Sequence, residues 1–238
     1  TITIQSLTAA TTYYIGIFEM SGSPGCYNST AAALQGAIVT SQLDLIGLGT
    51  GTTTTDGSYQ GVFNNYWENN KSQILYKQSE LGGSGPITEI AFDISSIAAA
   101  GYRTFTDMTI KLMHTSTSSF GTAYETTTGA TTVFSSASYA MPNATGWLSF
   151  DITDWAYNGT DNLLVEVSWG DNGEYTSTRY YHNHTDYTSG GDQLVAYGYW
   201  DSPTTSGYDS RSDIRPNIQF TKTCGIAAGT TSSTAGGA

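Results

Sequence analysis

The feature that most constrains the fold is a succession of short segments in which apolar and polar residues alternate, each ended by turn-forming residues. An alternation of period two places successive side chains on opposite faces of a β-strand. No segment shows the sustained apolar period of about 3.6 residues that an amphipathic helix needs. The turn clusters at 82–85, 142–146 and 157–162 are rich in Gly, Asn or Pro. The sequence therefore predicts an all-β protein.

Residues 43–222 contain enough of these segments for a jelly-roll-like β-sandwich. The first strand opens near Leu45 and passes into a Gly/Thr loop. Residues 94–105 are expected to form a short helix or a loop. The remaining predicted strands are 73–81, 86–94, 107–115, 131–139, 146–152, 162–170, 177–183, 193–200 and 215–220.

Residues 1–42 have a different pattern. Leu7, Thr11 and Tyr13 have the spacing of a tyrosine corner, in which a phenol hydroxyl bonds to upstream backbone. The strands around them, with the run 31–41, resemble the last three strands of a fibronectin type III domain. The resemblance implies the C-terminal strands of a fibronectin type III-like or Ig-like sandwich before the jelly roll.

Half a sandwich leaves an apolar face and a strand edge unpaired. Three explanations stay open: the upstream strands were cut away or left out, the strands dock onto the next domain, or they complete a sandwich in a neighbouring chain. The third would make the protein a filament subunit. Residues 223–238 are expected to be a linker or the start of a following module, so we expect the chain to belong to something longer.

Composition narrows the class of partner. Only 12% of the residues are charged, and the net charge is −12. Nucleic acid is an unsuitable partner because its phosphates would be repelled. No run reaches the roughly 18 apolar residues of a membrane span. We expect an extracellular or cell-surface protein that stays soluble through hydroxyl and amide groups.

The stretch 45–220 resembles a domain that recurs in large secreted surface proteins of the Bacteroidetes. The matching pieces are LIGLGTGTTTT, KSQILYKQSEL with PITEIAFDI, LMHT, GWLSFDI, NGTDNLLVEVSW and RPNIQF. The resemblance implies a jelly-roll-like sandwich between fibronectin-type or immunoglobulin-like modules. Such proteins are exported by the type IX system and act as adhesins or as accessory regions of hydrolases. The resemblance brings no catalytic motif.

The candidate metal ligands are mostly oxygens. Asp151, Asp154, Asn158 and Asp161 lie in a stretch that is expected to be a loop between two strands, and a hard cation such as calcium prefers such ligands. The spacing is not that of an EF-hand, and Asp and Asn also simply build turns. His182 and His184, two residues apart, could hold a metal or could merely be solvated.

The candidate sugar-binding residues are aromatic. In the run 195–200, Tyr197 and Tyr199 share one face, and Trp200 points to the other. Flat rings on an open sheet would stack against sugars of a surface glycan. Aromatic residues of a sandwich also build its core.

Two cysteines, Cys26 and Cys224, could pair with each other, pair elsewhere or stay free. The sequence has no nucleophile elbow, zinc-protease motif or phosphate-binding loop. We therefore expect a non-enzymatic structural or adhesion module, pairing by strands with copies of itself or with neighbouring modules. The alternative is a carbohydrate-binding module attached to a secreted hydrolase.

Overall fold

The computed structural model describes side chains in residues 44–52, 61–63, 65–170, 192–201 and 207–223. It describes backbone alone in strands at 12–17, 20–21, 26–27, 34–39, 43, 181–182 and 184–185. The chain divides into two compact units, Thr1–Leu43 with Thr223–Ala238, and Asp44–Lys222. No helix in the described part is long and apolar enough to cross a membrane.

Among the described residues of the first unit there are two antiparallel strand pairs. Strand β1 (Thr12–Ile17) pairs with β4 (Leu34–Val39), and β2 (Met20–Ser21) pairs with β3 (Cys26–Tyr27). Strands β1 and β4 fall in two of the segments expected to be strands, and the fibronectin type III-like character of this unit stays a prediction. The third expected strand, at 1–5, and residues Leu7 and Thr11 of the tyrosine corner lie outside the described residues.

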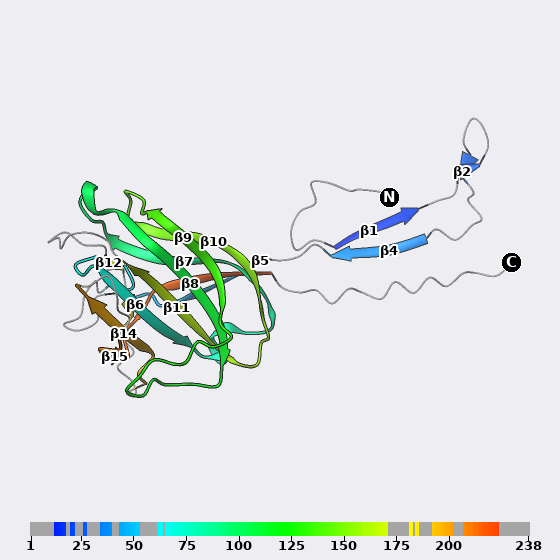
Figure 1. The fold of residues 1–238 in the computed structure, drawn as a ribbon. Coiled ribbons are helices and arrows are strands. Elements are labelled where there is room, and N and C mark those ends of the chain that lie inside the picture. The colour runs from blue at the N-terminus through cyan, green and yellow to red at the C-terminus, as the bar shows by residue number, and fades with distance from the viewer. Residues whose placement is uncertain are drawn as a thin grey trace. The chain divides into compact units, whose positions relative to one another are not determined.

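The second unit is a β-sandwich of two antiparallel sheets (Figure 1). The first sheet has the order β10-β7-β17-β5, and β12 pairs with β7 beside it. The second sheet has the order β15-β14-β6-β11-β8-β9. The strand bounds are β5 Leu43–Leu48, β6 Asn69–Tyr76, β7 Gly85–Ser96, β8 Thr104–Thr115, β9 Thr131–Ala140, β10 Gly146–Tyr157, β11 Asn162–Gly170, β12 Tyr181–His182, β13 His184–Thr185, β14 Val195–Trp200, β15 Ser210–Ser212, β16 Arg215–Pro216 and β17 Ile218–Thr223.

The pairing follows the jelly-roll pattern. Eight strands form four nested neighbour pairs, β5 with β17, β6 with β11, β7 with β10, and β8 with β9, so that early strands return beside late ones. The pairs are divided between the two sheets, as when one long hairpin wraps around a core. Strands β14 and β15 widen the second sheet beyond β6. The predicted jelly-roll-like sandwich is confirmed.

The core between the sheets is aromatic and is closed by a loop. Phe63, fully buried, precedes β6 and inserts between the sheets. Its ring lies 5.2 Å from that of Phe92 and 5.9 Å from that of Phe150, measured between centroids. The indole nitrogen of Trp169 donates to the carbonyl of Val62 at 2.8 Å, which fixes the loop in place. A ring of this size buried from all sides stabilises the fold by several kilocalories per mole.

The predicted strand 73–81 ends earlier than expected. Strand β6 stops at Tyr76, and a single turn of helix, α1 (Gln78–Leu81), follows. The Glu80 carboxylate accepts the Lys77 backbone N–H at 2.7 Å, and buried Arg215 donates to the same carboxylate. The Lys222 ammonium donates to the carbonyls of Leu81 and Gly83 at the end of the turn. These contacts outweigh the strand-like pattern of the sequence.

Two further expectations concern connections. Within 94–105, β7 continues to Ser96 and a short 3₁₀ turn, η1 (Ala100–Tyr102), follows, so the segment is partly strand and partly turn. The predicted strand 146–152 extends instead to Tyr157. The stretch expected to be a long loop is therefore mostly strand, and only residues 158–161 connect β10 to β11.

Candidate functional site

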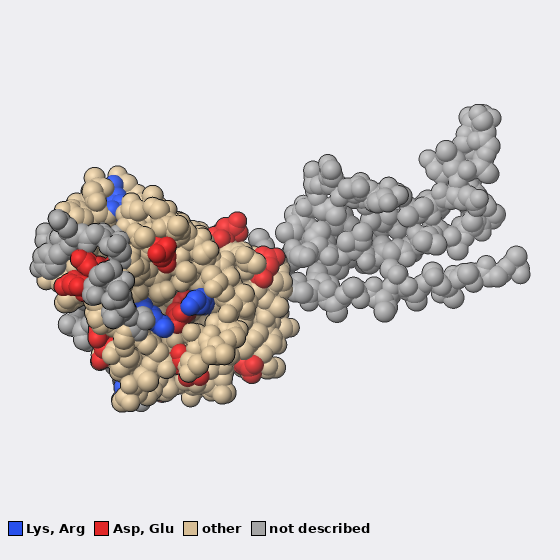
Figure 2. Space-filling model, in the orientation of Figure 1, with Lys and Arg blue, Asp and Glu red and all other residues tan. Residues whose placement is uncertain are grey.

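A buried carboxylate lies on the outer face of the second sheet. Glu166 of β11 is only 1% exposed, and two lysines from the neighbouring strands hold it. Its Oε1 lies 2.9 Å from the Lys111 ammonium of β8, and its Oε2 lies 3.2 Å from the Lys71 ammonium of β6. We call Glu166, Lys71 and Lys111 the charged triad. Figure 2 shows acidic and basic side chains gathered on an otherwise largely uncharged surface.

A long loop, residues 116–130, covers part of the same face. Gln73 connects it to the triad, because its amide donates to Glu166 Oε2 at 2.8 Å and to the Glu125 carbonyl at 2.9 Å. The Glu125 backbone N–H donates back to Gln73 Oε1 at 2.8 Å. Phe120 of the loop is buried over Leu75 and Leu164. The loop is therefore attached to the sheet by both polar and apolar contacts.

The electrostatics of Glu166 favour a stabilising role. Burial raises the pKa of its carboxyl, but hydrogen bonds from Gln73 and Lys111 and the charges of Lys71 and Lys111 outweigh burial and hold the pKa below its usual value. A general base that works near neutral pH needs a raised pKa and an accessible oxygen. Both Glu166 oxygens are already engaged. The triad is suited to fixing strands and loop, and poorly suited to proton transfer.

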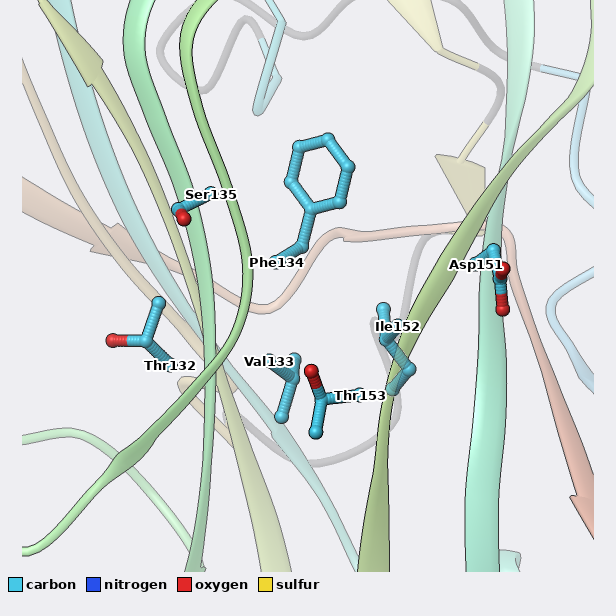
Figure 3. Close-up of a pocket in the computed structure, with 7 residues that line it drawn as sticks. All are labelled: Thr132, Val133, Phe134, Ser135, Asp151, Ile152 and Thr153. Carbon is cyan, nitrogen blue, oxygen red and sulfur yellow. The ribbon is translucent and has the colours of Figure 1, made fainter.

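A groove of about 460 Å³ runs between β9 and β10, the edge strands of the two sheets. The pairing of β9 with β8 shifts register at Val133, and the pairing of β10 with β7 shifts register between Asp151 and Trp155, so both edge strands are irregular beside the groove. Val133, Ile152 and Thr153 come together between the strands, whereas Asp151 points to the other side of β10 (Figure 3). The remaining lining residues are Thr132, Phe134 and Ser135. Three of the lining residues carry hydroxyl groups, three are apolar, and Asp151 adds a carboxylate.

The four candidate calcium ligands are separated by the structure. Asp151 and Asp154 are exposed on β10, whereas Asn158 and Asp161 lie in the turn after it. In the turn, Asn158 Oδ1 accepts the backbone N–H groups of Thr160 and Asp161, and its amide donates to Asp161 Oδ2 at 2.6 Å. These oxygens build the turn. Within the described ranges, no three His, Cys, Asp or Glu side chains are grouped as a metal site would require.

The structure places the three candidate sugar-binding aromatics on two different faces of β14. Tyr197 and Tyr199 are 3% and 9% exposed and belong to the core, so their rings offer no open platform. Trp200 lies on the opposite, outer face, as the alternation predicts. Its ring covers Gly198, where an added Cβ would approach it to 2.0 Å. The strand therefore requires glycine at 198 to accommodate the tryptophan.

The remaining candidates are only partly described. Cys26 lies in β3, but neither its side chain nor Cys224 is among the described residues, so the disulfide stays a prediction. His182 belongs to β12, which pairs with β7, and His184 belongs to β13, which pairs with β16. The two histidine backbones thus lie in different strand pairs, and their side chains lie outside the described part.

Sequence reasoning missed two features. Glu166 lies in a run that is buried on both faces, and a lone Glu there could have indicated a buried ion pair. Trp147, at the start of β10, is 44% exposed, and with Leu45 it is one of the exposed large hydrophobics in the described residues. Its position at alternate parity to Leu148 and Phe150 could have placed it on the outer face.

No family model matches the chain, and neither a curated protein nor a solved structure does. The resemblance to Bacteroidetes surface domains therefore depends on the sequence motifs alone.

Proposed function

We propose that the protein is a non-enzymatic extracellular module with a structural or adhesive role, which joins other protein by pairing strands at the free edge of its sandwich. The partners are copies of the same chain or neighbouring modules of a surface protein. The observation that carries this proposal is the character of strand β9 (Thr131–Ala140), the edge of the second sheet.

Edge strands expose unpaired backbone N–H and C=O groups, and soluble proteins usually protect them with lysine, proline or inward-pointing charge. Strand β9 has the sequence TTVFSSASYA, which contains no charged residue, no proline and no glycine. Within the described residues it pairs with β8 on one side only. On its other side, β10 of the first sheet packs nearby without pairing with it among the described residues, so that side still offers backbone groups to an added strand.

The register of β9 indicates which of its residues could pair with an added strand. Its irregularity lies at Val133, because Ile110 pairs with Phe134 and Lys111 with Thr132. From Phe134 to Ala140 the ladder with β8 runs in step, so this half presents a regular edge. Ala137 and Ser138 are exposed in this half. We call residues 134–140 the β9 edge.

The remaining support comes from composition and from the charged triad. A low charge content with abundant hydroxyls suits a stalk-like module outside the cell. Glu166, the best-buried carboxylate in the described ranges, is held ionised by lysines and is unsuited to acid–base chemistry at neutral pH. These features suit a structural role better than a catalytic one.

The test is the mass of the full chain in solution, measured by sedimentation over a range of concentrations. We expect the wild type to form oligomers or filaments, and the variant Ala137→Lys/Ser138→Lys to stay monomeric because two lysines protect the edge. The control, Ser118→Lys/Ser119→Lys, adds the same charge at exposed positions of the 116–130 loop and should still assemble. A wild type that stays monomeric throughout, or assembly equal in all three proteins, would refute the proposal.

A further inference from the structure

The outer face of the first sheet carries an exposed tryptophan in a polar setting. Trp147 of β10 lies opposite Asp93 of β7, with the core residues Leu148 and Phe92 turned the other way. The indole is 44% exposed, and it makes no hydrogen bond or ring contact with another described side chain. A single exposed aromatic ring is not unusual in itself, so the polar groups around Trp147 decide what this ring can contact.

The next row of side chains forms a shallow floor beside this ring. Ser149 of β10, Ala91 of β7 and Gln219 of β17 lie side by side across three strands. Ala91 is on the outer face but is only 2% exposed, so it separates Ser149 from Gln219 without offering surface to a ligand. Rows on one face of a sheet are about 7 Å apart. Ser149 therefore lies one row from Trp147, whereas Gln219 lies one row along and two strands across, so a ligand of more than one sugar ring is needed to reach all three.

This face carries a small negative charge. Asp93, Glu89 and Asp151 are its acidic groups, and strands β7 and β10 contain no lysine or arginine. The one basic residue of β17, Lys222, is 2% exposed and is bound to the carbonyls of Leu81 and Gly83. An anionic ligand such as a phosphate or a uronic acid would be repelled here.

We propose that this surface, formed by Trp147, Asp93, Ser149 and Gln219, binds neutral oligosaccharides; we call it the Trp147 face. The indole stacks against the apolar C–H side of one sugar ring, while Asp93, Ser149 and Gln219 bond to hydroxyls. This inference goes beyond the proposed function and does not depend on the β9 edge.

The chemistry of the face favours a sugar over a protein. A stable protein interface usually buries about 800 Å² per partner around a cluster of apolar anchors. The Trp147 face offers one ring surrounded by carboxylate, hydroxyl and amide groups. A pyranose has the matching composition, with one apolar side and a rim of hydroxyls, and a few well-placed polar groups with an aromatic surface are what small-ligand sites provide.

The test uses isothermal titration of the full chain with three neutral probes, cellohexaose, xylohexaose and mannohexaose, and with an anionic probe, hexagalacturonic acid. We expect at least one neutral hexaose to bind and the anionic probe not to bind. Trp147→Ala should weaken that binding about tenfold or more, as truncation of an aromatic anchor does. Trp147→Phe, which keeps a smaller ring, and Gln219→Ala should weaken it less.

The matched control is Trp200→Ala, which removes the half-buried tryptophan on the opposite sheet and should leave sugar affinity unchanged. Urea unfolding of each variant verifies that it is folded. The proposal is overturned if no neutral hexaose binds at millimolar concentration, if Trp147→Ala binds as the wild type does, or if Trp200→Ala alone removes binding. Each of these results leaves the strand-pairing proposal intact, because that proposal is judged by solution mass.

Discussion

The carboxylate of Glu166 and the ammonium of Lys111 lie on neighbouring strands with 2.9 Å between Oε1 and Nζ, and the carboxylate is 1% exposed. With Lys71 on the strand at its other side, Glu166 bridges three consecutive strands of the second sheet. Gln73 extends this arrangement to the loop 116–130. The loop and the sheet are thus connected through one buried carboxylate.

Replacing that carboxylate should destabilise the sandwich. Glu166→Gln leaves two ammonium groups facing a neutral amide, and we expect the free energy of unfolding to fall by about 2 kcal/mol. Urea denaturation at pH 7 measures the change. The control is Glu89→Gln, on the outer face of the other sheet, where the carboxylate accepts a weak bond from Thr221 at 3.3 Å; it should cost less than about 0.5 kcal/mol. Equal effects at the two positions would contradict the role of the triad.

Stability should also depend on pH through the same group. The pKa of Glu166 is lowered in the folded state, so its contribution is complete above its unfolded value of 4.5 and is lost as the pH falls through the lower, folded value. The difference in unfolding free energy between wild type and Glu166→Gln should therefore shrink between pH 5 and pH 3. Urea titrations across that range measure it. A difference that grows on acidification would contradict a lowered pKa of Glu166 in the folded state.

Arg215 should not be replaceable by lysine. Its guanidinium is buried, donates to the Leu75 carbonyl and to Glu80 at 2.9 Å each, and lies over the Tyr76 ring at 4.8 Å. Lysine keeps the positive charge but lacks the planar set of N–H donors with which the guanidinium binds two groups at once. Arg215→Lys should therefore lower the free energy of unfolding by about 2–4 kcal/mol. Arg211→Lys, which alters exposed contacts to Phe120 and Gly121, should have a much smaller effect. Thermal unfolding compares the two, and similar losses would contradict the account.

Phe63 should be the most sensitive position outside the strands. Because its ring contacts Phe92, Phe105 and Phe150 between the sheets, Phe63→Ala should cost about 3–5 kcal/mol. Leu45→Ala, at a side chain that is 60% exposed, should change stability by less than about 0.5 kcal/mol. Guanidinium unfolding of both variants provides the comparison. A mild effect of Phe63→Ala would mean that the loop does not close the core.

The fold could be predicted because its strands alternate clearly and its turns are marked by Gly, Asn and Pro. The pattern placed Tyr197 and Trp200 on opposite faces of β14, but it could not say which face was the core, because β14 is buried on both sides. Helix α1 was missed because its stability comes from Arg215 and Lys222, which lie far along the chain. Long-range contacts of this kind leave no local sequence pattern.

The candidate site was harder to predict for a related reason. Asp151 and Asp154 are close in sequence to Asn158 and Asp161, and this proximity favoured a single loop. Strand β10, however, continues to Tyr157 through a bulge, because Trp155 and Tyr157 pack into the core, so only the last two residues lie in the turn. The role proposed for Trp147 depends on Asp93, which only the strand pairing places opposite it, and on Gln219, which lies two strands away on the same face.

The central claim, that the β9 edge pairs with another strand, is tested most directly by amide hydrogen exchange of the full chain at increasing protein concentration. Amides of residues 134–140 should become more protected as concentration rises, because an added strand would accept their hydrogen bonds, while amides of the 116–130 loop should not change. In the Ala137→Lys/Ser138→Lys variant this protection should be independent of concentration. Protection at 134–140 that never varies with concentration in the wild type would contradict the claim.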